Sequence, residues 1–206
     1  MRGLFVTFEG IDRSGKTTQA RMLLDALGDE AVGVREPGGT AAGERIRALL
    51  KDPEVGLSAE AETLLFAAAR AELVAGVIRP ALDAGRVVVS DRFLDSSLAY
   101  QGAARGLGVE QVERINSFAT GALRPDLTLL LDIDTGAAGR RGAVEDDRFE
   151  QEGATLQEQV AAAYDELAAA DPGRWRRIAA DREPAAVHED VLAAVEAARK
   201  APAGER

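Results

Sequence analysis

The stretch FEGIDRSGKTTQ, residues 8–19, contains two glycines separated by four residues, Gly10 and Gly15, followed directly by Lys16 and Thr17. This is the spacing of a phosphate-binding loop. An apolar run over residues 4–8 predicts a buried strand before the loop, and residues 17–27 have the apolar spacing of a helix. This order brings backbone N–H groups and a helix N-terminus to one point, where they bind anions. The sequence therefore predicts a site for the phosphates of a nucleoside triphosphate.

The rest of the chain alternates between predicted strands and predicted helices. Further strands are expected at residues 31–35, 86–92, 127–133 and 175–179, and further helices at residues 41–50, 59–82, 109–120, 155–169 and 185–199. Such alternation favours parallel pairing through right-handed crossovers. We therefore expect an α/β three-layer sandwich, with a mostly parallel five-stranded sheet flanked by helices. A single domain over residues 1–206 is expected, with a loop at about 140–152 and a frayed tail at about 200–206.

Composition limits the classes of function. The 206 residues include no cysteine, which excludes disulfides, thiolate metal ligands and a cysteine nucleophile. The formal charge of −10 argues against a protein that coats nucleic acid, although a local group of arginines can still bind phosphate inside one cleft. The chain has no signal-peptide pattern and no run of about 20 apolar residues that would cross a bilayer. We expect a cytoplasmic protein without nucleic-acid or membrane partners.

Two other segments suggest ligand binding. Asp91 and Arg92 follow the most apolar predicted strand, where Asp91 would hold a magnesium-bound water and Arg92 would bridge phosphates; a simple salt bridge explains the pair equally well. Phe66 and Arg70 lie four residues apart on one face of a predicted helix. A ring beside a guanidinium suits a planar base with a carbonyl edge, although core packing better explains Phe66 taken alone.

Arginines are a third candidate group, because phosphoryl transfer needs cations around the moving charge and shielding from water. The candidates are Arg13, Arg47, Arg140, Arg141 and Arg148. The chain lacks the Asn-Lys-x-Asp pattern of a guanine reader, which argues against a GTPase. A kinase for another acceptor, such as a deoxynucleoside, and an ATP-dependent switch both remain open from these residues.

The order and spacing of several segments resemble the thymidylate kinase family over nearly the whole chain. These segments are FEGIDRSGKTTQ, REPGGT, LLFAAAR, VVSDRF, SSLAYQG, RPDLTLLLD, DRFE and DREPAAVHEDV. The family transfers the γ-phosphoryl group of ATP to dTMP with Mg²⁺, and its members are usually cytoplasmic homodimers. The resemblance implies a fold of the P-loop kinase type in which residues 140–152 form a short lid.

The resemblance also implies roles for individual residues. ATP would be bound by Gly10, Ile11, Asp12, Arg13, Ser14, Gly15, Lys16, Thr17, Thr18, Arg141 and Arg182, and Mg²⁺ by Thr17 and, through water, Asp91. The residues implied for dTMP are Asp12, Arg47, Phe66, Arg70, Arg92, Ser97, Tyr100 and Gln101. In this set Asp12 would bind the 3′-hydroxyl, Arg47 and Arg92 the phosphate, and Phe66 and Arg70 the base. Tyr100 would lie against the sugar C2′, with Ser97 and Gln101 lining the base pocket.

The catalytic set implied by the resemblance is Arg13, Lys16 and Arg92. In the family the arginine that contacts the transferring phosphoryl group comes either from the phosphate-binding loop or from the lid. This sequence has Arg13 in the loop and Arg140 and Arg148 in the lid, and we favour Arg13. The acceptor phosphate is already an anionic nucleophile, so positioning and charge neutralisation should provide the rate without a general base.

Overall fold

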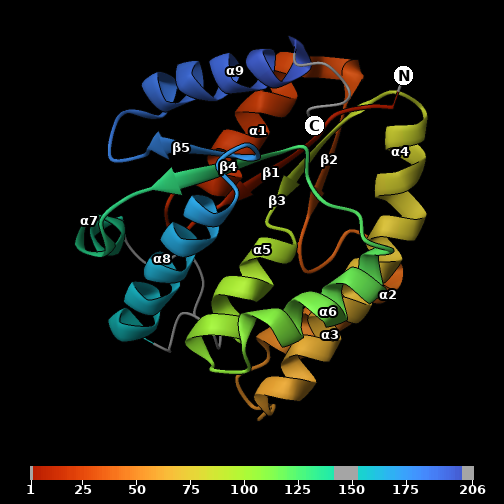
Figure 1. The fold of residues 1–206 in the computed structure, drawn as a ribbon, viewed down its shortest axis with the longest axis vertical. Helices are drawn as coiled ribbons and strands as arrows, with labels where there is room; N and C mark the ends of the chain where they lie inside the picture. The colour runs from red at the N-terminus through yellow and green to blue at the C-terminus, as the bar shows by residue number, and fades with distance from the viewer. Residues whose placement is uncertain (1, 142–152, 201–206) are drawn as a thin grey trace.

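The computed structural model describes residues 2–141 and 153–200, and within them five strands form one sheet in the order β2-β3-β1-β4-β5 (Figure 1). The strands are β1 (Phe5–Glu9), β2 (Ala31–Arg35), β3 (Val87–Asp91), β4 (Leu127–Asp132) and β5 (Trp175–Ala179). Every neighbouring pair is parallel. The predicted α/β class and five-stranded sheet are confirmed, and the sheet is parallel throughout.

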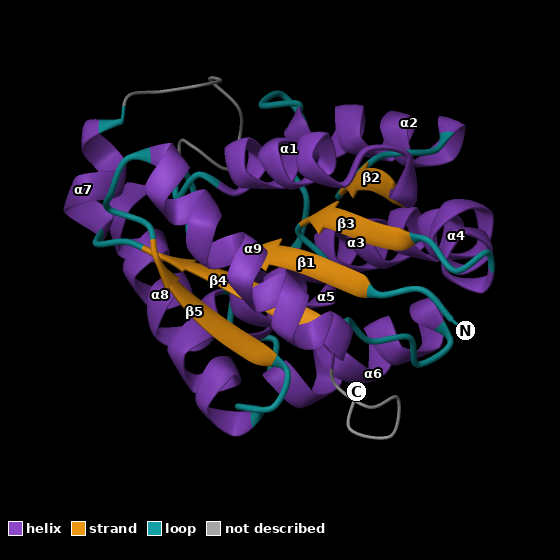
Figure 2. Cartoon of the chain, turned by 90° about the horizontal axis from the view of Figure 1, so that it is seen from above, coloured by secondary structure: helices purple, strands orange, loops and turns teal. Residues whose placement is uncertain are grey.

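Helices lie on both faces of the sheet, as Figure 2 shows from above. They are α1 (Lys16–Leu27), α2 (Ala41–Lys51), α3 (Ala59–Leu73), α4 (Arg79–Asp83), α5 (Leu94–Ser97), α6 (Val109–Thr120), α7 (Thr135–Arg140), α8 (Gly153–Ala170) and α9 (Pro184–Lys200), with short 3₁₀ and π segments η1 (Gly28–Glu30), η2 (Val74–Ile78) and η3 (Leu98–Ala104). None of the described helices is both long and apolar enough to cross a membrane.

Burial along the strands follows their place in the sheet. All five residues of β1, the central strand, are buried, because helices cover both of its faces. The outer strands β2 and β5 expose part of their length. One core cluster joins the sheet to α1, α8 and α9 through residues such as Leu23, Val160 and Val191. A second joins it to α3, α4 and α6 through residues such as Leu73 and Val112. Both faces of the sheet are thus packed against helices.

The predicted helix over residues 59–82 is interrupted. It consists of α3, the π segment η2 and α4. Pro80 lies in the first turn of α4 and has no N–H to donate to a carbonyl one turn earlier. The N–H of Arg79 donates to the carbonyl of Val74, five residues back, so the backbone widens by one residue before the proline.

The sequence did not predict the helical segments α5 with η3, or α7. The α5–η3 segment covers the whole of the stretch SSLAYQG, residues 96–102, which the sequence marked only for its chemistry. Helix α7 occupies residues up to Arg140, where the predicted lid begins, and Asp134 caps it by accepting from the N–H of Ala137 at 3.1 Å. Residues 142–152 of the predicted lid, with Arg148, and residues 201–206 of the predicted tail lie outside the described residues.

Candidate active site

A cavity of about 1090 Å³ opens where β1, β2 and β3 end, and its walls include the segments that follow these strands, part of α3, Arg141 and the segment that follows β5. Parallel sheets bind ligands at this edge. The structure brings most of the predicted site residues into these walls: Asp12, Arg13, Ser14, Gly15, Lys16, Thr17, Thr18, Arg47, Phe66, Arg70, Asp91, Arg92, Ser97, Tyr100, Gln101, Arg141 and Arg182. Gly10 and Ile11 are buried at the base of the loop, where their carbonyls accept hydrogen bonds from Nζ of Lys16.

The loop between β1 and α1 needs glycine for a geometric reason. Gly10 has φ 140°, and a Cβ at this position would lie 2.7 Å from the carbonyl oxygen of Leu131 on β4. Gly15 has φ 102° and Arg13 has φ 63°, so three loop residues adopt positive φ. The loop can therefore turn back on itself directly above the central strand.

Lys16 begins α1 and folds back over the loop. Its Nζ donates to the carbonyl oxygens of Ile11 at 2.6 Å and Gly10 at 3.1 Å, and to Oγ of Ser14 at 3.3 Å. Burial, together with the nearby Arg92 guanidinium, lowers the pKa of Lys16 to about 8. The ammonium is thus held in the loop at the point where phosphate oxygens would collect.

The lowered pKa of Lys16 predicts that ATP binding takes up a proton at alkaline pH. Above pH 8 the free protein loses the ammonium charge, whereas bound polyphosphate favours the protonated lysine, so affinity should fall as pH rises through 8. Titration calorimetry in two buffers of different ionisation enthalpy should detect uptake approaching about one proton at pH 9 and almost none at pH 6.5. In Lys16→Arg, which stays charged, the uptake should disappear. Equal proton counts at both pH values in the wild type would contradict this assignment.

Thr17 and Asp91 meet beside the loop. The Thr17 hydroxyl donates to Oδ2 of Asp91 at 2.5 Å, which connects the first turn of α1 to the end of β3. A hydroxyl and a carboxylate are oxygen ligands of the kind that Mg²⁺ uses next to phosphates and water. The residues present therefore fit the predicted magnesium site.

Asp12 and Arg92 form an ion pair across the cavity. Arg92, at φ 69°, also donates to Oγ of Ser96 at 3.0 Å, and its guanidinium carbon lies 5.2 Å from the ring centre of Tyr100. Burial acts to raise the pKa of Asp12, but the charges of Arg92 and Lys16 outweigh it and hold that pKa below its usual value. Gln157 of α8 contacts Asp12 twice, at 2.7 Å and 3.0 Å. The loop, the end of β3 and α8 are thus joined at one carboxylate.

Glu9 is a buried carboxylate behind this pair that the sequence analysis did not identify. It accepts from the N–H of Phe93 at 2.8 Å, Oγ of Ser96 at 2.6 Å and the hydroxyl of Tyr164 at 2.8 Å. Burial and the nearby Asp95 raise the pKa of Glu9 to about 7. Since Ser96 also contacts Arg92, Glu9 holds the segment that carries this arginine. An acid at the end of an otherwise apolar strand was the only local signal.

The part of the cavity predicted to hold the base includes Arg70, whose side chain is only 1% exposed. Its Nε donates to Oε2 of Glu36 at 2.7 Å, and its Nη atoms donate to Oγ of Ser97, the carbonyl of Phe93 and Oδ1 of Asn116. The structure thus brings Arg70 and Ser97 together as predicted. Glu36 and Asn116 are partners that the sequence analysis missed, because they come from β2–α2 and α6.

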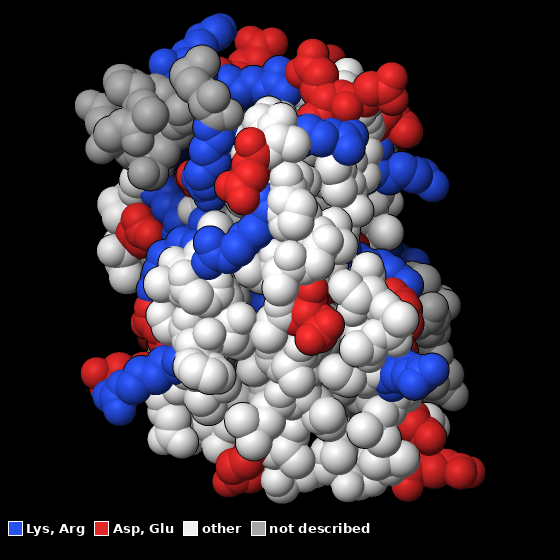
Figure 3. All heavy atoms as spheres, turned by 90° about the vertical axis from the view of Figure 1, so that its right-hand side faces the viewer, with Lys and Arg blue, Asp and Glu red and all other residues white. Residues whose placement is uncertain are grey.

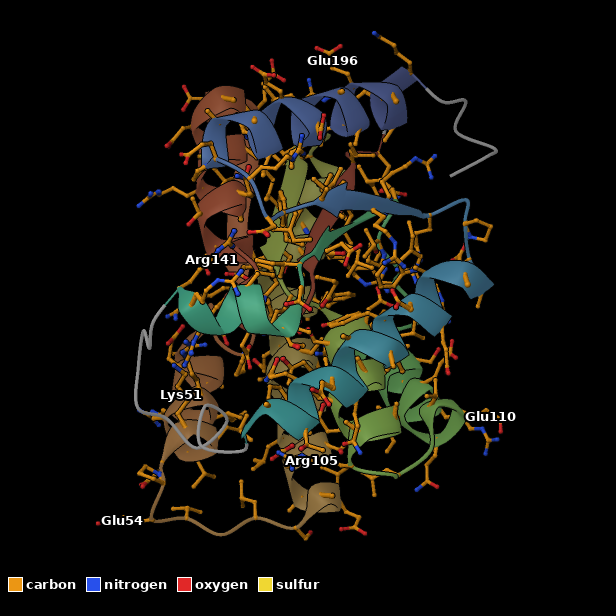
Figure 4. All side chains as sticks on the ribbon, turned by 90° about the vertical axis from the view of Figure 1, so that its left-hand side faces the viewer. Lys51, Glu54, Arg105, Glu110, Arg141 and Glu196 are labelled. Atoms are coloured by element: carbon orange, nitrogen blue, oxygen red, sulfur yellow. The ribbon has the colours of Figure 1, made fainter. Side chains whose placement is uncertain are left out.

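The remaining predicted residues occupy the rim of the cavity. Arg47 of α2 donates to the carbonyl of Pro37 at 3.0 Å. Arg141, which Figure 4 shows beside α1, donates to the carbonyls of Arg13 and Ser14, both at 3.1 Å, and to that of Ala180 at 2.6 Å. Arg182 forms an ion pair with Asp190 and donates to the carbonyl of Ala179 at 3.0 Å. Arg141 therefore joins the phosphate-binding loop to the segment after β5, which also carries Arg182.

Two sets of cationic and polar groups share this cavity. One set belongs to the phosphate-binding loop, and the other includes Arg92, Arg47 and Arg70. This parallel α/β fold and this site are those of P-loop nucleoside monophosphate kinases. These enzymes bind a nucleoside triphosphate and a nucleoside monophosphate in one cavity.

Comparison with known proteins gives the family. The family model described as "Thymidylate kinase" matches residues 8–191. The chain is 50% identical over 202 residues to a thymidylate kinase of Halorhodospira halophila, covering 94% of each chain, and 49% identical over 189 residues to one of Desulforudis audaxviator, covering 89% of this chain and 86% of the relative. A crystal structure of thymidylate kinase from Ehrlichia chaffeensis superposes with a TM-score of 0.80 at 30% identity, covering 95% of this chain and 100% of that chain. The chain belongs to the thymidylate kinase family.

Proposed function

We propose that the chain transfers the γ-phosphoryl group of ATP to dTMP, giving dTDP and ADP, in the cytoplasmic synthesis of dTTP. The observation that carries the proposal is the Asp12–Arg92 ion pair, which joins the phosphate-binding loop to the base side of the same cavity. Arg92 and Arg47 offer charge to an acceptor that already carries a phosphate, which favours a monophosphate over a deoxynucleoside. Phe66, Arg70, Ser97 and Gln101 line the part of the cavity that would hold the base.

In the proposed reaction an oxygen of the dTMP phosphate attacks the γ-phosphorus of ATP. A new P–O bond forms to this oxygen, and the bond to the β–γ bridging oxygen breaks, so that ADP leaves with the electron pair. Lys16 and the N–H groups of the loop bind the ATP phosphates, and Arg92 holds the acceptor. Thr17 and Asp91 would hold Mg²⁺, which neutralises charge on the phosphate oxygens when bound. Arg13 provides the cation that stabilises the charge of the phosphoryl group during its transfer.

A panel assay tests the proposal. ADP formation is measured with Mg²⁺ and ATP plus dTMP, dUMP, dCMP, dGMP or thymidine, and without any acceptor. The proposal requires dTMP to give the highest kcat/KM and dTDP as the product. Preference for thymidine would favour a deoxynucleoside kinase, and ATP consumption without an acceptor would favour an ATP-dependent switch.

We further propose that the chain forms a homodimer. Helix α3 packs against both α2 and α6. Large apolar side chains are exposed on these three helices: Leu49 on α2, Leu64 on α3 and Phe118 on α6, the last 92% exposed. Figure 3, which faces the side of the molecule with α2, α4 and α6, shows a broad, mostly uncharged area in its lower half. Apolar surface of this kind is characteristic of protein interfaces.

Replacing Phe118 by glutamate is expected to convert the dimer to a monomer. A charge in the middle of an apolar interface loses its hydration when the interface forms, and the cost is several kcal/mol. Sedimentation velocity at micromolar concentration should show a species of half the wild-type mass. Glu110→Gln, at the other end of α6, is the control and should leave the mass unchanged. A wild-type chain that sediments as a monomer would refute the dimer.

A further inference from the structure

Glu62, a buried carboxylate on α3, holds two side chains of the neighbouring helical segment. Its Oε1 accepts from Nε2 of Gln101 at 2.8 Å, and its two oxygens accept from Nε and Nη2 of Arg105 at 2.6 Å and 3.1 Å. Gln101 lies within η3, and Arg105 directly follows it; Figure 4 shows Arg105 at the end of the molecule opposite α9. Glu62 and Gln101 are 1% and 2% exposed. The contact is therefore sheltered from competing water.

The pairing with Glu62 fixes which end of the Gln101 amide is nitrogen. A carboxylate paired with an arginine can only accept hydrogen bonds, so it must face the amide N–H₂ and not the amide oxygen. Turning the amide over would place two oxygens against each other in a buried site. Gln101 is thus held in one of the two orientations that its shape alone would allow.

Gln101 lines the same cavity as Arg70, Ser97 and Phe66. Because the amide nitrogen of Gln101 is bonded to Glu62, the group that Gln101 can offer to a base in this cavity is its carbonyl oxygen, an acceptor. Arg70 has only donors. A donor beside an acceptor complements the edge of thymine, in which a carbonyl oxygen lies next to the N3–H group. Cytosine offers the opposite pattern, an amino donor next to an N3 acceptor.

We propose that Glu62 is a positioning residue for base selection: by orienting the Gln101 amide it makes the pocket accept an imide edge and reject an aminopyrimidine edge. This inference rests on the proposed phosphorylation of dTMP. Glu62 is not among the residues that line the cavity, so it acts through Gln101, which is. Its effect should therefore appear in the choice between thymine and cytosine bases and leave the response to the thymine methyl group unchanged.

The test compares wild type with Glu62→Gln, measuring kcat/KM for dTMP, dUMP and dCMP. A glutamine at position 62 can donate as well as accept, so both orientations of Gln101 become available. The dTMP/dCMP ratio should fall about tenfold or more, because the pocket no longer leaves a cytosine edge unpaired. The dTMP/dUMP ratio should stay within about twofold, since the two bases share the imide edge and differ only by a methyl group.

A second variant restores the acceptor. In Glu62→Gln/Gln101→Glu the composition is unchanged, but a carboxylate at position 101 can only accept, whichever way it turns. The dTMP/dCMP ratio should return toward the wild-type value. If Glu62→Gln does not fold, this double variant alone remains decisive, because a folded double variant that has lost the discrimination overturns the proposal.

Other outcomes are equally decisive. Unchanged ratios in Glu62→Gln would show that the amide orientation does not depend on Glu62. If the dTMP/dCMP and dTMP/dUMP ratios fell by the same factor, the substitution would have loosened the pocket in general and would not have changed its choice of base edge. This result would also overturn the proposal. Failure of the proposed function is distinguishable from both, because then the wild-type chain itself would show no preference for dTMP.

Discussion

Replacing Arg13 by alanine should lower kcat about 10³-fold while leaving the KM for ATP nearly unchanged. An arginine that contacts the transferring group acts mainly in the transition state, and in related phosphoryl transfers it is worth about 10³–10⁵ in rate. Arg13 lies in the phosphate-binding loop and lines the cavity, on the same loop as Lys16. We therefore expect the substitution to affect the transfer of the γ-phosphoryl group.

The substitution is informative because it leaves the loop backbone in place. The Arg13 carbonyl, which accepts from Arg141, is retained, and alanine meets the same positive φ as arginine. Arg13→Lys, which keeps the charge but not the planar guanidinium, should recover part of the rate. Arg140→Ala is the matched control at the end of α7. If Arg13→Ala turns over at the wild-type rate, the role belongs to Arg140 or Arg148 instead.

The phosphate-binding loop could be predicted from the sequence because its physics is local. Gly10, Gly15, Lys16 and Thr17 lie within eight positions, and the turn, the N–H groups and the helix N-terminus all come from this stretch. The strands could be predicted for a similar reason, since buried parallel strands have continuous apolar runs. The strands predicted at 31–35 and 175–179 have the predicted bounds, whereas the first strand shifted by one residue, from 4–8 to Phe5–Glu9, which moved Glu9 from the loop into the buried end of β1.

The partners of the site residues could not be predicted, because they come from distant parts of the chain. Arg70 and Phe66 were recognised from their spacing on one helix, but Asn116, which accepts from Arg70, is 46 positions away. Gln157, which holds Asp12, is 145 positions away. Residue type and spacing indicate which group a side chain can bind, while the topology of the sheet decides which partner reaches it.

The effect of removing Arg70 on stability could not be predicted from the sequence, because it depends on a partner from another part of the chain. Arg70→Ala should lower the free energy of unfolding by about 3–5 kcal/mol, since it leaves the buried carboxylate of Glu36 without its cation. Oε1 of Glu36 has no hydrogen-bond partner among the described residues, so Arg70 is the only charged group shown to offset the burial of this carboxylate. Urea unfolding at pH 7.5 measures the loss.

The dependence of this loss on pH identifies its cause. Burial already raises the pKa of Glu36, although Arg70 opposes the shift, so without Arg70 that pKa should rise further. A carboxyl whose pKa is raised in the folded state favours folding when protonated, and this contribution is lost as pH rises through the folded pKa. The deficit of Arg70→Ala should therefore be smaller near pH 5 than at pH 7.5.

The double variant Glu36→Gln/Arg70→Ala separates stability from recognition. Without a buried charge it should recover most of the lost free energy, yet it should still bind dTMP weakly if Arg70 has the proposed role of donor to the base. Calorimetry should show ATP affinity close to wild type in the double variant. Equal losses of ATP and dTMP affinity would contradict the placement of Arg70 on the base side. Arg70→Ala with unaltered stability would show that the Glu36–Arg70 pair contributes nothing to the fold.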